Sequence, residues 1–434
     1  MRSGMRFRLR KSPKTIDLAV RLLTRKAGLF VPYYRELFAS SALQPHSIDH
    51  AEALAMLPIT PRRRLSELPY RHFVHEKARL NRLYVSHTSG GTGTPATMFL
   101  SRMEVYYRRF LLLRATRSRF PECLPTRVAD VGQVISRNVP RNPQRFGPIR
   151  VTRIPGTLPM PEQVRLYTES APQLLEGYAG CLELLGEELS TTRRYPRPRW
   201  LISRGEALTP PARAFLEKVF GCPVANFYNS EEVGNMAWEC PHRTGTLHVN
   251  TDACIIELLD EHGDAVPQGE EGRVVLTNLY NHTMPFIRYD IGDHATWDDP
   301  DPHPCTCGAN TPTLASIDGR TDDFLFLPDS RRVSPLVVLT AVLYGFSHTT
   351  PEGTHVPQVR QFQVVQDKMG EAEIRVVLRR SMPPDAVERI QAKFEELHPK
   401  FRTRVSVVEA IPLEQSGKLK RIICHVAPPC TPPW

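Results

Sequence analysis

The chain has 434 residues, which is more than one typical domain contains and enough to bury a large core without disulfide staples. Apolar residues make up 41% and charged residues 24%, an ordinary globular composition, and the 40 prolines and 25 glycines follow no collagen period. These values exclude a disulfide-stapled miniprotein and a fibrous chain. No run reaches the roughly 18 apolar residues of a membrane span, so we expect none.

The net charge of +10 at pH 7 arises entirely in the first 80 residues, where 16 Lys and Arg face six Asp and Glu. Six basic residues form one run, namely Arg2, Arg6, Arg8, Arg10, Lys11 and Lys14. We interpret this run as a solvated tail, with contact to a phosphate-bearing partner as the alternative. A nucleic-acid-binding protein is disfavoured, because no DNA-binding motif occurs.

An apolar stretch at 16–23 follows the basic run and is interrupted by Asp17 and Arg21. No small-residue cleavage site follows, so the pattern predicts an amphipathic helix and not a signal peptide. The nine cysteines are odd in number and mostly scattered. They indicate a reducing compartment, which we take to be the cytoplasm, with free thiols and one metal site.

From Tyr84 onward, short apolar runs alternate with helical stretches, which favours an α/β fold with layers. Thr209 is suited to cap a helix whose first turn holds two prolines. The expected helices cover 102–119, 162–168, 183–190 and 210–220, and the expected buried strands cover 127–131, 198–203 and 223–228.

Residues 253–297 are rich in β-forming residues and predict a smaller β subdomain with strands at 254–259, 272–277 and 294–297. After Arg320, about 110 residues read as a compact α+β domain. Its expected strands cover 324–327, 361–366, 373–379 and 405–409, and its expected helices cover 335–344 and 384–398. We therefore expect a domain at 1–319, whose first 30 residues are the tail and amphipathic helix, and a domain at 320–434.

A loop rich in hydroxyls and glycines follows the apolar residues at 84–87. Its residues are Thr88, Ser89, Gly90, Gly91, Thr92 and Gly93. Glycine lets the backbone approach a ligand closely, and successive N–H groups can surround a phosphate. The lysine of a P-loop is absent, which disfavours a P-loop NTPase. The alternative is a flexible surface loop.

Two further segments suit a nucleotide. Tyr228, Glu231 and Glu232 follow one apolar strand, and an aromatic face can stack on a purine while a carboxylate can bind Mg²⁺. Asp293 could accept hydrogen bonds from a ribose diol; alternatively it satisfies backbone N–H groups in a turn. Lys418, which follows Gly417, can extend from its loop into a cleft, or lie in an ordinary exposed basic turn.

Together with the segment at 319–323, and in this order and spacing, these motifs resemble the adenylate-forming superfamily of acyl-CoA synthetases, luciferases and adenylation domains. The run from Tyr228 to Cys240 and the Cys-x-Cys-Gly at 305–308 are similar to the phenylacetate-CoA ligase branch with its CapK-like and deazaflavin-coenzyme-adenylating relatives. The resemblance covers roughly residues 30–425 and implies a large α/β domain with a small mobile C-terminal lid.

The resemblance implies a reaction in two steps, in which a carboxylate attacks ATP to give acyl-AMP and a thiol, typically CoA, then displaces AMP. Two anions must meet in the first step, so a cation is needed where charge develops. The resemblance implies that residues 88–93 bind the phosphates, that Tyr228 contacts adenine and that Glu232 binds Mg²⁺. It implies that Asp293, with Arg320 nearby, binds the ribose, and that Lys418 bridges the carboxylate and the α-phosphate. Gly205 and Glu206 are a looser match on the nucleotide side, and Asp322 corresponds to the hinge.

Two positions depart from the family pattern. Gly91 stands where a Ser or Thr is usual, which removes one hydroxyl from the phosphate loop, and Asn229 replaces a usual glycine beside Tyr228. Ser89 and Thr92 remain, so we expect activity to persist. A catalytically altered relative is the alternative.

Four residues could hold a structural zinc ion: Cys240, His248, Cys305 and Cys307. Thiolates and imidazole suit tetrahedral Zn²⁺, and the pattern resembles a structural site in part of this branch. His242 is a rival fourth ligand, and buried free thiols are the alternative to a metal.

The sequence thus predicts an ATP-dependent ligase that joins an organic acid, in the first instance an aryl acid, to CoA, with no nucleic-acid partner and, on the family pattern, a homodimer. The alternatives are an adenylating enzyme with an amine, an amino acid or a carrier-protein thiol as acceptor, and a regulatory nucleotide-binding protein. The presence of Lys418 favours an enzyme.

Overall fold

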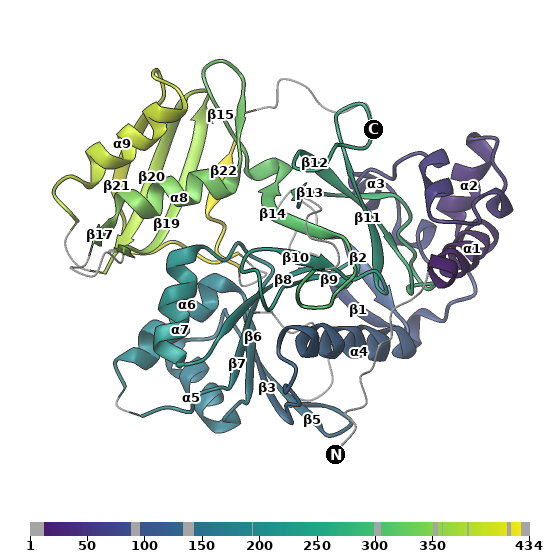
Figure 1. The fold of residues 1–434 in the computed structure, drawn as a ribbon, viewed down its shortest axis with the longest axis horizontal. Coiled ribbons are helices and arrows are strands. Elements are labelled where there is room, and N and C mark those ends of the chain that lie inside the picture. The colour runs from purple at the N-terminus through teal and green to yellow at the C-terminus, as the bar shows by residue number, and fades with distance from the viewer. Residues whose placement is uncertain are drawn as a thin grey trace.

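The computed structural model describes residues 13–87, 96–132, 143–192, 194–298, 305–349, 355–357, 359–379, 382–414 and 418–426. Two main sheets organise these residues, one of 12 strands in the larger lobe and one of four strands in the C-terminal lobe. The two lobes lie side by side, with the C-terminal lobe against α6 and α7 (Figure 1). None of the helices in these ranges is long and apolar enough to cross a membrane.

The large sheet has the strand order β11-β12-β13-β14-β10-β9-β8-β7-β6-β3-β5-β4. Strands β5, β3, β6, β7 and β8, in one half of the sheet, run parallel, and the remaining strand pairs are antiparallel. The strands are β3 (Arg127–Gly132), β4 (Gln144–Phe146), β5 (Ile149–Pro155), β6 (Leu174–Gly177), β7 (Trp200–Arg204), β8 (Val224–Ser230), β9 (Gly234–Glu239), β10 (Leu247–Val249), β11 (Cys254–Leu259), β12 (Glu271–Asn278), β13 (Tyr289–Trp297) and β14 (Thr313–Arg320).

Helices cover both faces of the parallel part of this sheet. Helix α4 (Arg102–Arg119) packs on one face, and α5 (Met160–Ser170), α6 (Ala179–Ser190) and α7 (Pro210–Phe220) pack on the other. Successive strand residues therefore serve different cores: Leu174 packs toward α4 and Leu175 toward the three helices. Burial on both faces explains why these strands read as continuous apolar runs.

The N-terminal helices α1 (Pro13–Phe30), α2 (Pro32–Ser40) and α3 (Arg64–Glu67) lie near the antiparallel end of the sheet (Figure 1). Val20, Leu23 and Ala27 of α1 share a core with strands β11 to β13. The predicted amphipathic helix is thus confirmed and is longer than expected. A hairpin of β1 (Tyr84–His87) and β2 (Thr97–Leu100) leads into α4, whose first turn is closed by a capping box between Ser101 and Glu104.

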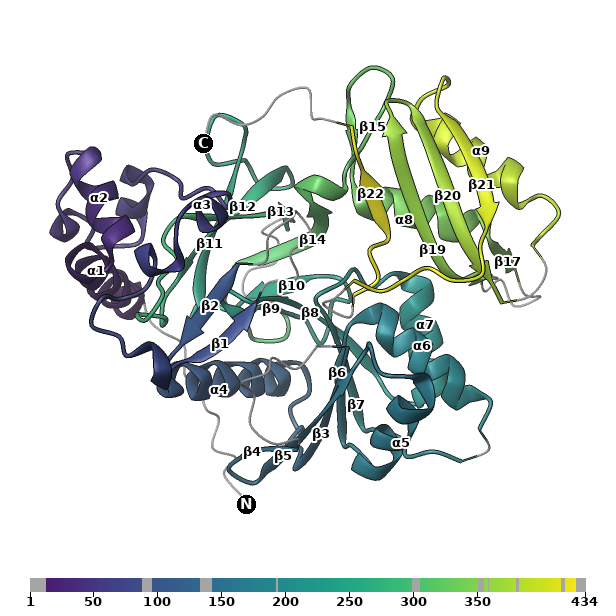
Figure 2. The ribbon, with the colours of Figure 1, turned by 180° about the vertical axis from the view of Figure 1, so that it is seen from behind.

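The C-terminal lobe has its own apolar core beneath a sheet of order β21-β20-β19-β22 (Figure 2). Helices α8 (Pro335–Gly345) and α9 (Ala386–Leu397) contribute to that core. The strands of the lobe are β15 (Leu325–Phe326), β16 (Arg332–Val333), β17 (Ser347–Thr349), β18 (His355–Pro357), β19 (Val359–Lys368), β20 (Glu371–Leu378), β21 (Arg402–Val407) and β22 (Ile422–Cys424).

All predicted helices are present, and α4 and α7 have the predicted bounds. Helix α6 begins at Ala179, four residues earlier than expected, because an apolar Ala-Gly-Cys-Leu segment forms its first turn. The predicted β-rich stretch is present and joins the main sheet through β13 and β14. The sequence did not predict several strands of the main sheet, among them β5, β6, β9, β10 and β14. Strands β6 and β10 are short, and β5 and β14 contain charged residues.

Candidate active site

A cavity of about 1610 Å³ opens between the carboxyl edge of the parallel strands and the C-terminal lobe. Its lining includes Asn226 and Tyr228 of β8 from the larger lobe, and Leu339 of α8 and Lys418 from the smaller lobe. The carboxyl edge of an open α/β sheet is the usual place for a ligand. The cavity is therefore the candidate active site.

Tyr228, Asp293 and Arg320 meet on one side of this cavity, although they lie far apart in the sequence. The Tyr228 hydroxyl donates to Oδ2 of Asp293 at 2.6 Å, and Nε of Arg320 lies 3.6 Å from Oδ1 of the same carboxylate. Pairing of β13 with β14 sets Asp293 directly opposite Arg320. Burial, reinforced by the Asp293 charge, raises the pKa of Tyr228, so its hydroxyl remains a donor.

The loop after β8 presents two carboxylates to the cavity. Nη1 of Arg108 lies 3.9 Å from Oε2 of Glu231, and Arg108 also donates to the Glu231 carbonyl. Glu232 is 4% exposed; its carbonyl accepts from Asn278 at 2.9 Å, while its carboxylate makes no hydrogen bond to any residue in the described ranges. The Glu232 carboxylate is thus available to a cation.

Lys418 reaches the cavity from the C-terminal lobe. Its Nζ lies 5.0 Å from the centre of the Tyr178 ring, and a methyl group at Gly205 would lie 3.7 Å from it. Gly205 has a φ of +73°, and the same methyl group would lie only 2.8 Å from Tyr178, so glycine is needed here. Burial lowers the pKa of Lys418, and the nearby Glu206 charge opposes that effect.

Glu206 joins the two lobes. Its Oε2 accepts from the N–H of Gly180 in the first turn of α6 at 2.8 Å, and its Oε1 accepts from the N–H of Leu419 at 3.2 Å. Burial raises the pKa of Glu206, and these donors oppose the rise. Because both oxygens hold backbone groups, Glu206 sets the position of the loop that carries Lys418; its predicted contact with nucleotide stays a prediction.

The predicted phosphate loop, Thr88 to Gly93, lies outside the described residues. The strands that flank it do reach the site, since Val85 and Ser86 of β1 and Thr97 of β2 line the cavity. Asp322 lines the cavity in a short helical turn, Thr321–Asp323, between β14 and β15. Its role as a hinge stays a prediction.

Sequence reasoning missed several ionisable groups in the cavity wall. Asp130 in β3 and Glu176 in β6 are each about 1% exposed, and Arg204 ends β7. An ionisable residue inside an otherwise apolar strand was the available signal, because such residues are almost never fully buried without a partner.

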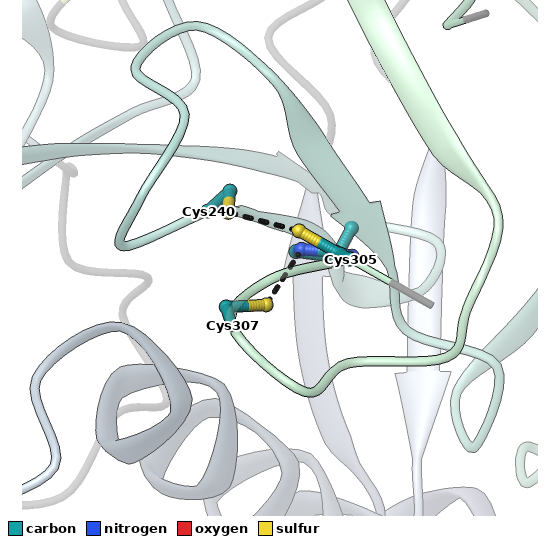
Figure 3. A group of neighbouring side chains, drawn as sticks. Cys240, Cys305 and Cys307 are labelled. Atoms are coloured by element: carbon teal, nitrogen blue, oxygen red, sulfur yellow. Dashed lines mark hydrogen bonds between the residues drawn. The ribbon is translucent and has the colours of Figure 1, made fainter. Parts of the chain in front are cut away.

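Cys240, His248, Cys305 and Cys307 form a compact group beside β10, with all ligand atoms within 4.8 Å of one another. The sulfur atoms of Cys240 and Cys305 are 3.6 Å apart, and the Cys307 sulfur lies 3.2 Å from Nε2 of His248 (Figure 3). Tetrahedral zinc with Zn–S bonds of about 2.3 Å needs sulfur separations of roughly 3.8 Å, so the group fits the ion.

His248, and not its rival His242, lies with the three cysteines. Pairing of β10 with β9 and β14 brings His248 opposite Trp238 and Thr313, between the segments that supply the thiols. The His248 Nδ1 is 3.4 Å from the Thr311 hydroxyl, which can orient the ring. His242 is exposed at its side chain and contacts Thr306.

No family model matches the chain. A phenylacetate-coenzyme A ligase of Thermus thermophilus is 24% identical over 429 residues, which cover 91% of this chain and 92% of that protein. Protein CapK of Staphylococcus aureus is 27% identical over 180 residues, which cover 40% of this chain and 37% of that protein.

Among solved structures, a 2-hydroxyisobutyryl-CoA ligase in its postadenylation state has a TM-score of 0.74 at 18% identity, covering 95% of this chain and 89% of that one. The same ligase in its thioesterification state has a TM-score of 0.61 at 20% identity, with the same coverage.

The chain thus has the fold of the adenylate-forming ligases, and about nine tenths of its length is similar in sequence to a phenylacetate-coenzyme A ligase. The relatives that it resembles are named phenylacetate-coenzyme A ligases and protein CapK, and this similarity supports an enzyme of the adenylate-forming ligase type.

We expect Gly234→Ala to disturb the loop that carries Glu231 and Glu232. Gly234 has a φ of +85°, and a methyl group there would lie 2.8 Å from the Arg108 side chain. Gly269→Ala is the matched control, because Gly269 has a φ of +80° with nothing within 4 Å. Chemical unfolding should show a loss for Gly234→Ala that exceeds the control by about 1 kcal/mol or more. Equal losses would contradict the steric argument.

Proposed function

We propose that the protein uses ATP to adenylate an organic carboxylate and then transfers the acyl group to the thiol of CoA. One observation carries the proposal: Lys418 of the C-terminal lobe enters the cavity that also contains Tyr228, Asp293 and Arg320. A buried cation at that place can bring together two groups that repel each other, a carboxylate and a phosphate.

In the first step, a carboxylate oxygen attacks the α-phosphorus of ATP, and the bond to pyrophosphate breaks. Lys418 would neutralise the charge that develops between the two anions. Asp293, oriented by Tyr228 and Arg320, would accept hydrogen bonds from the ribose, and the ring of Tyr228 would contact adenine. The loop 88–93 would hold the phosphates, as the family resemblance implies.

Glu232 would bind the Mg²⁺ that accompanies ATP. Its buried carboxylate is of the ligand type that Mg²⁺ prefers, and it lies in the same cavity as Lys418. The ion would supply positive charge beside the phosphates.

In the second step, the thiolate attacks the acyl carbon, and AMP leaves with the bonding electrons. We infer that residues 320–434 form a mobile domain that swings about Asp322 between the two steps. This inference is supported by the separate core of the C-terminal lobe and by polar contacts between the lobes, such as Arg421 to Glu183 at 2.6 Å and Arg360 to Glu187 at 3.1 Å. Polar contacts can be exchanged without exposing apolar surface.

The proposal includes a structural zinc ion held by Cys240, His248, Cys305 and Cys307. Four protein ligands would close the coordination shell, so the ion would connect the loops around β10 and take no part in the reaction.

ATP–pyrophosphate exchange tests the proposed function. The purified protein is incubated with ATP, Mg²⁺ and a panel of carboxylic acids, and the acid that supports exchange is then offered CoA, an amine, an amino acid and a carrier-protein thiol. We expect acid-dependent exchange and thioester formation with CoA. Amide formation would favour the alternative acceptors, and lack of exchange across the panel would refute adenylation.

Lys418→Ala is expected to lower the rate of acyl-AMP formation by about 10²–10³-fold, because a preorganised charge is lost. Thioester formation from preformed acyl-AMP should remain largely intact. Lys393→Ala, which removes a lysine paired with Glu396 on α9, is the control. Equal loss of both half-reactions would contradict the assigned role.

The pH profile provides a second readout for Lys418. Because burial lowers its pKa, the amine loses its proton at a lower pH than the ordinary lysine value of about 10.4. The alkaline fall of kcat/KM for ATP should therefore come early, and Lys418→Arg should move it to higher pH. An unchanged profile would show that another group titrates.

Metal analysis should find about one zinc ion per chain. Cys307→Ser should release the ion and lower the melting temperature, whereas Cys222→Ser, at a buried cysteine outside the group, should keep it. A metal-free protein with all four groups titratable would remove the zinc proposal.

A further inference from the structure

The part of the cavity wall formed by β3, β5, β6, β7 and α4 contains five buried or half-buried charged groups. We name them the arginine cluster: Arg109, Arg153 and Arg204, with Asp130 and Glu176 between them. All five line the cavity, and none of them has a part in the proposed steps at the nucleotide.

The register of the parallel strands builds this cluster. Arg153 of β5 lies opposite Asp130 of β3, and Asp130 lies opposite Glu176 of β6. Residues paired in register share a face of the sheet, so the three side chains stand in one row facing α4, which supplies Arg109. Two residues earlier, the same strands carry an apolar row of Val151, Val128 and Leu174.

Each carboxylate has at least one arginine partner. Asp130 accepts from Nη2 of Arg204 at 2.5 Å and lies 3.5 Å from Nη1 of Arg153. Glu176 lies 3.3 Å from Nη1 of Arg109. The two acidic side chains are 1% exposed, whereas those of Arg109, Arg153 and Arg204 keep 22%, 17% and 12% exposure. The arginines are therefore the groups that a ligand would meet.

Three guanidinium groups face two carboxylates, so the arginine cluster holds one excess positive charge. Arginine stays protonated in proteins, and an uncompensated buried charge is costly. Nε of Arg204 is also buried and has no hydrogen-bond partner among the described residues. One monoanion in the cavity would balance this excess charge.

The arginine cluster lies where the far end of the substrate acid would be. Arg204 directly precedes Gly205, beside which Nζ of Lys418 lies, and Tyr178 is influenced electrostatically by both Arg204 and Asp130. Lys418 would hold the reacting carboxylate, and the nucleotide side with Tyr228 and Asp293 lies on β8 and β13, away from β3 and β5 in the strand order. The acyl chain would therefore extend toward β3.

We propose that the substrate is a dicarboxylic acid whose second carboxylate binds the arginine cluster while the first one is adenylated; this inference rests on the proposed function. The planar fork of arginine matches a carboxylate. Phe146, over whose ring Arg109 lies at 5.0 Å, adds an apolar wall for the carbon skeleton between the two carboxylates.

The test measures kcat/KM for ATP–pyrophosphate exchange with matched acids: adipate against hexanoate, and isophthalate against benzoate. We expect each diacid to exceed its monoacid by about 10²-fold or more, because the monoacid leaves buried polar groups unpaired. ω-Hydroxyhexanoate serves as a neutral polar probe. Preference for the monoacids, or equal use of the hydroxy acid and adipate, would overturn the inference and leave the proposed function standing. Absence of exchange with every acid would overturn both.

Two variants assign the preference to the arginine cluster. Arg204→Met should reduce the diacid preference at least tenfold, while Arg213→Met, which removes a similarly buried arginine paired with Glu239 at 2.5 Å outside the cavity, should keep it. Glu176→Gln increases the excess charge and should raise the ratio of diacid to monoacid, an effect that a merely structural ion network would not produce. If the ratio of diacid to monoacid kcat/KM is unchanged in both Arg204→Met and Glu176→Gln, the assignment is refuted. If Arg204→Met does not fold, the ratio measured for Glu176→Gln decides.

Discussion

The Glu206 carboxylate holds two backbone N–H groups from different lobes, that of Gly180 at the start of α6 and that of Leu419 beside Lys418. This bridge helps to set the position of the lysine, whose ammonium group lies over the ring of Tyr178 and close to Gly205. A carboxylate at a helix N-terminus is also favoured by the helix dipole. The same interaction thus binds the loop of one lobe and the first turn of a helix in the other.

The large sheet supplies the other side chains that line the cavity around this contact. Its parallel strands end together, so groups on β3, β6, β7 and β8 reach one cavity, while the antiparallel pair β13 and β14 adds Asp293 opposite Arg320. Burying so many charged side chains does little for stability, since the cost of desolvation offsets much of their attraction. Their retention in the cavity wall is more readily explained by ligand binding.

The cysteine and histidine group is not among the residues that line the cavity. Its members come from the end of β9, from β10 and from the segment before β14, three strands that are neighbours in the large sheet. Three kinds of contact therefore shape the site. Hydrogen bonds between the lobes position the loop of Lys418, strand register sets the charged walls, and the cysteine and histidine group lies in the loops around β10.

Much of the fold followed from local pattern: the capped helix after Thr209, the apolar strands that became β7 and β8, and the order of motifs that resembles a known superfamily. Local pattern could not show which face of β3 and β6 meets α4, because the residues next to Asp130 or Glu176 in the sequence do not indicate which arginine will pair with it. Those partners come from strands and a helix distant in sequence, and so do the choice of His248 over His242 and the contact of Glu206 with Leu419. The sequence by itself determined the chemistry available to the protein, whereas strand register and lobe packing alone decided which charges face one another, since such contacts join residues that no local spacing relates.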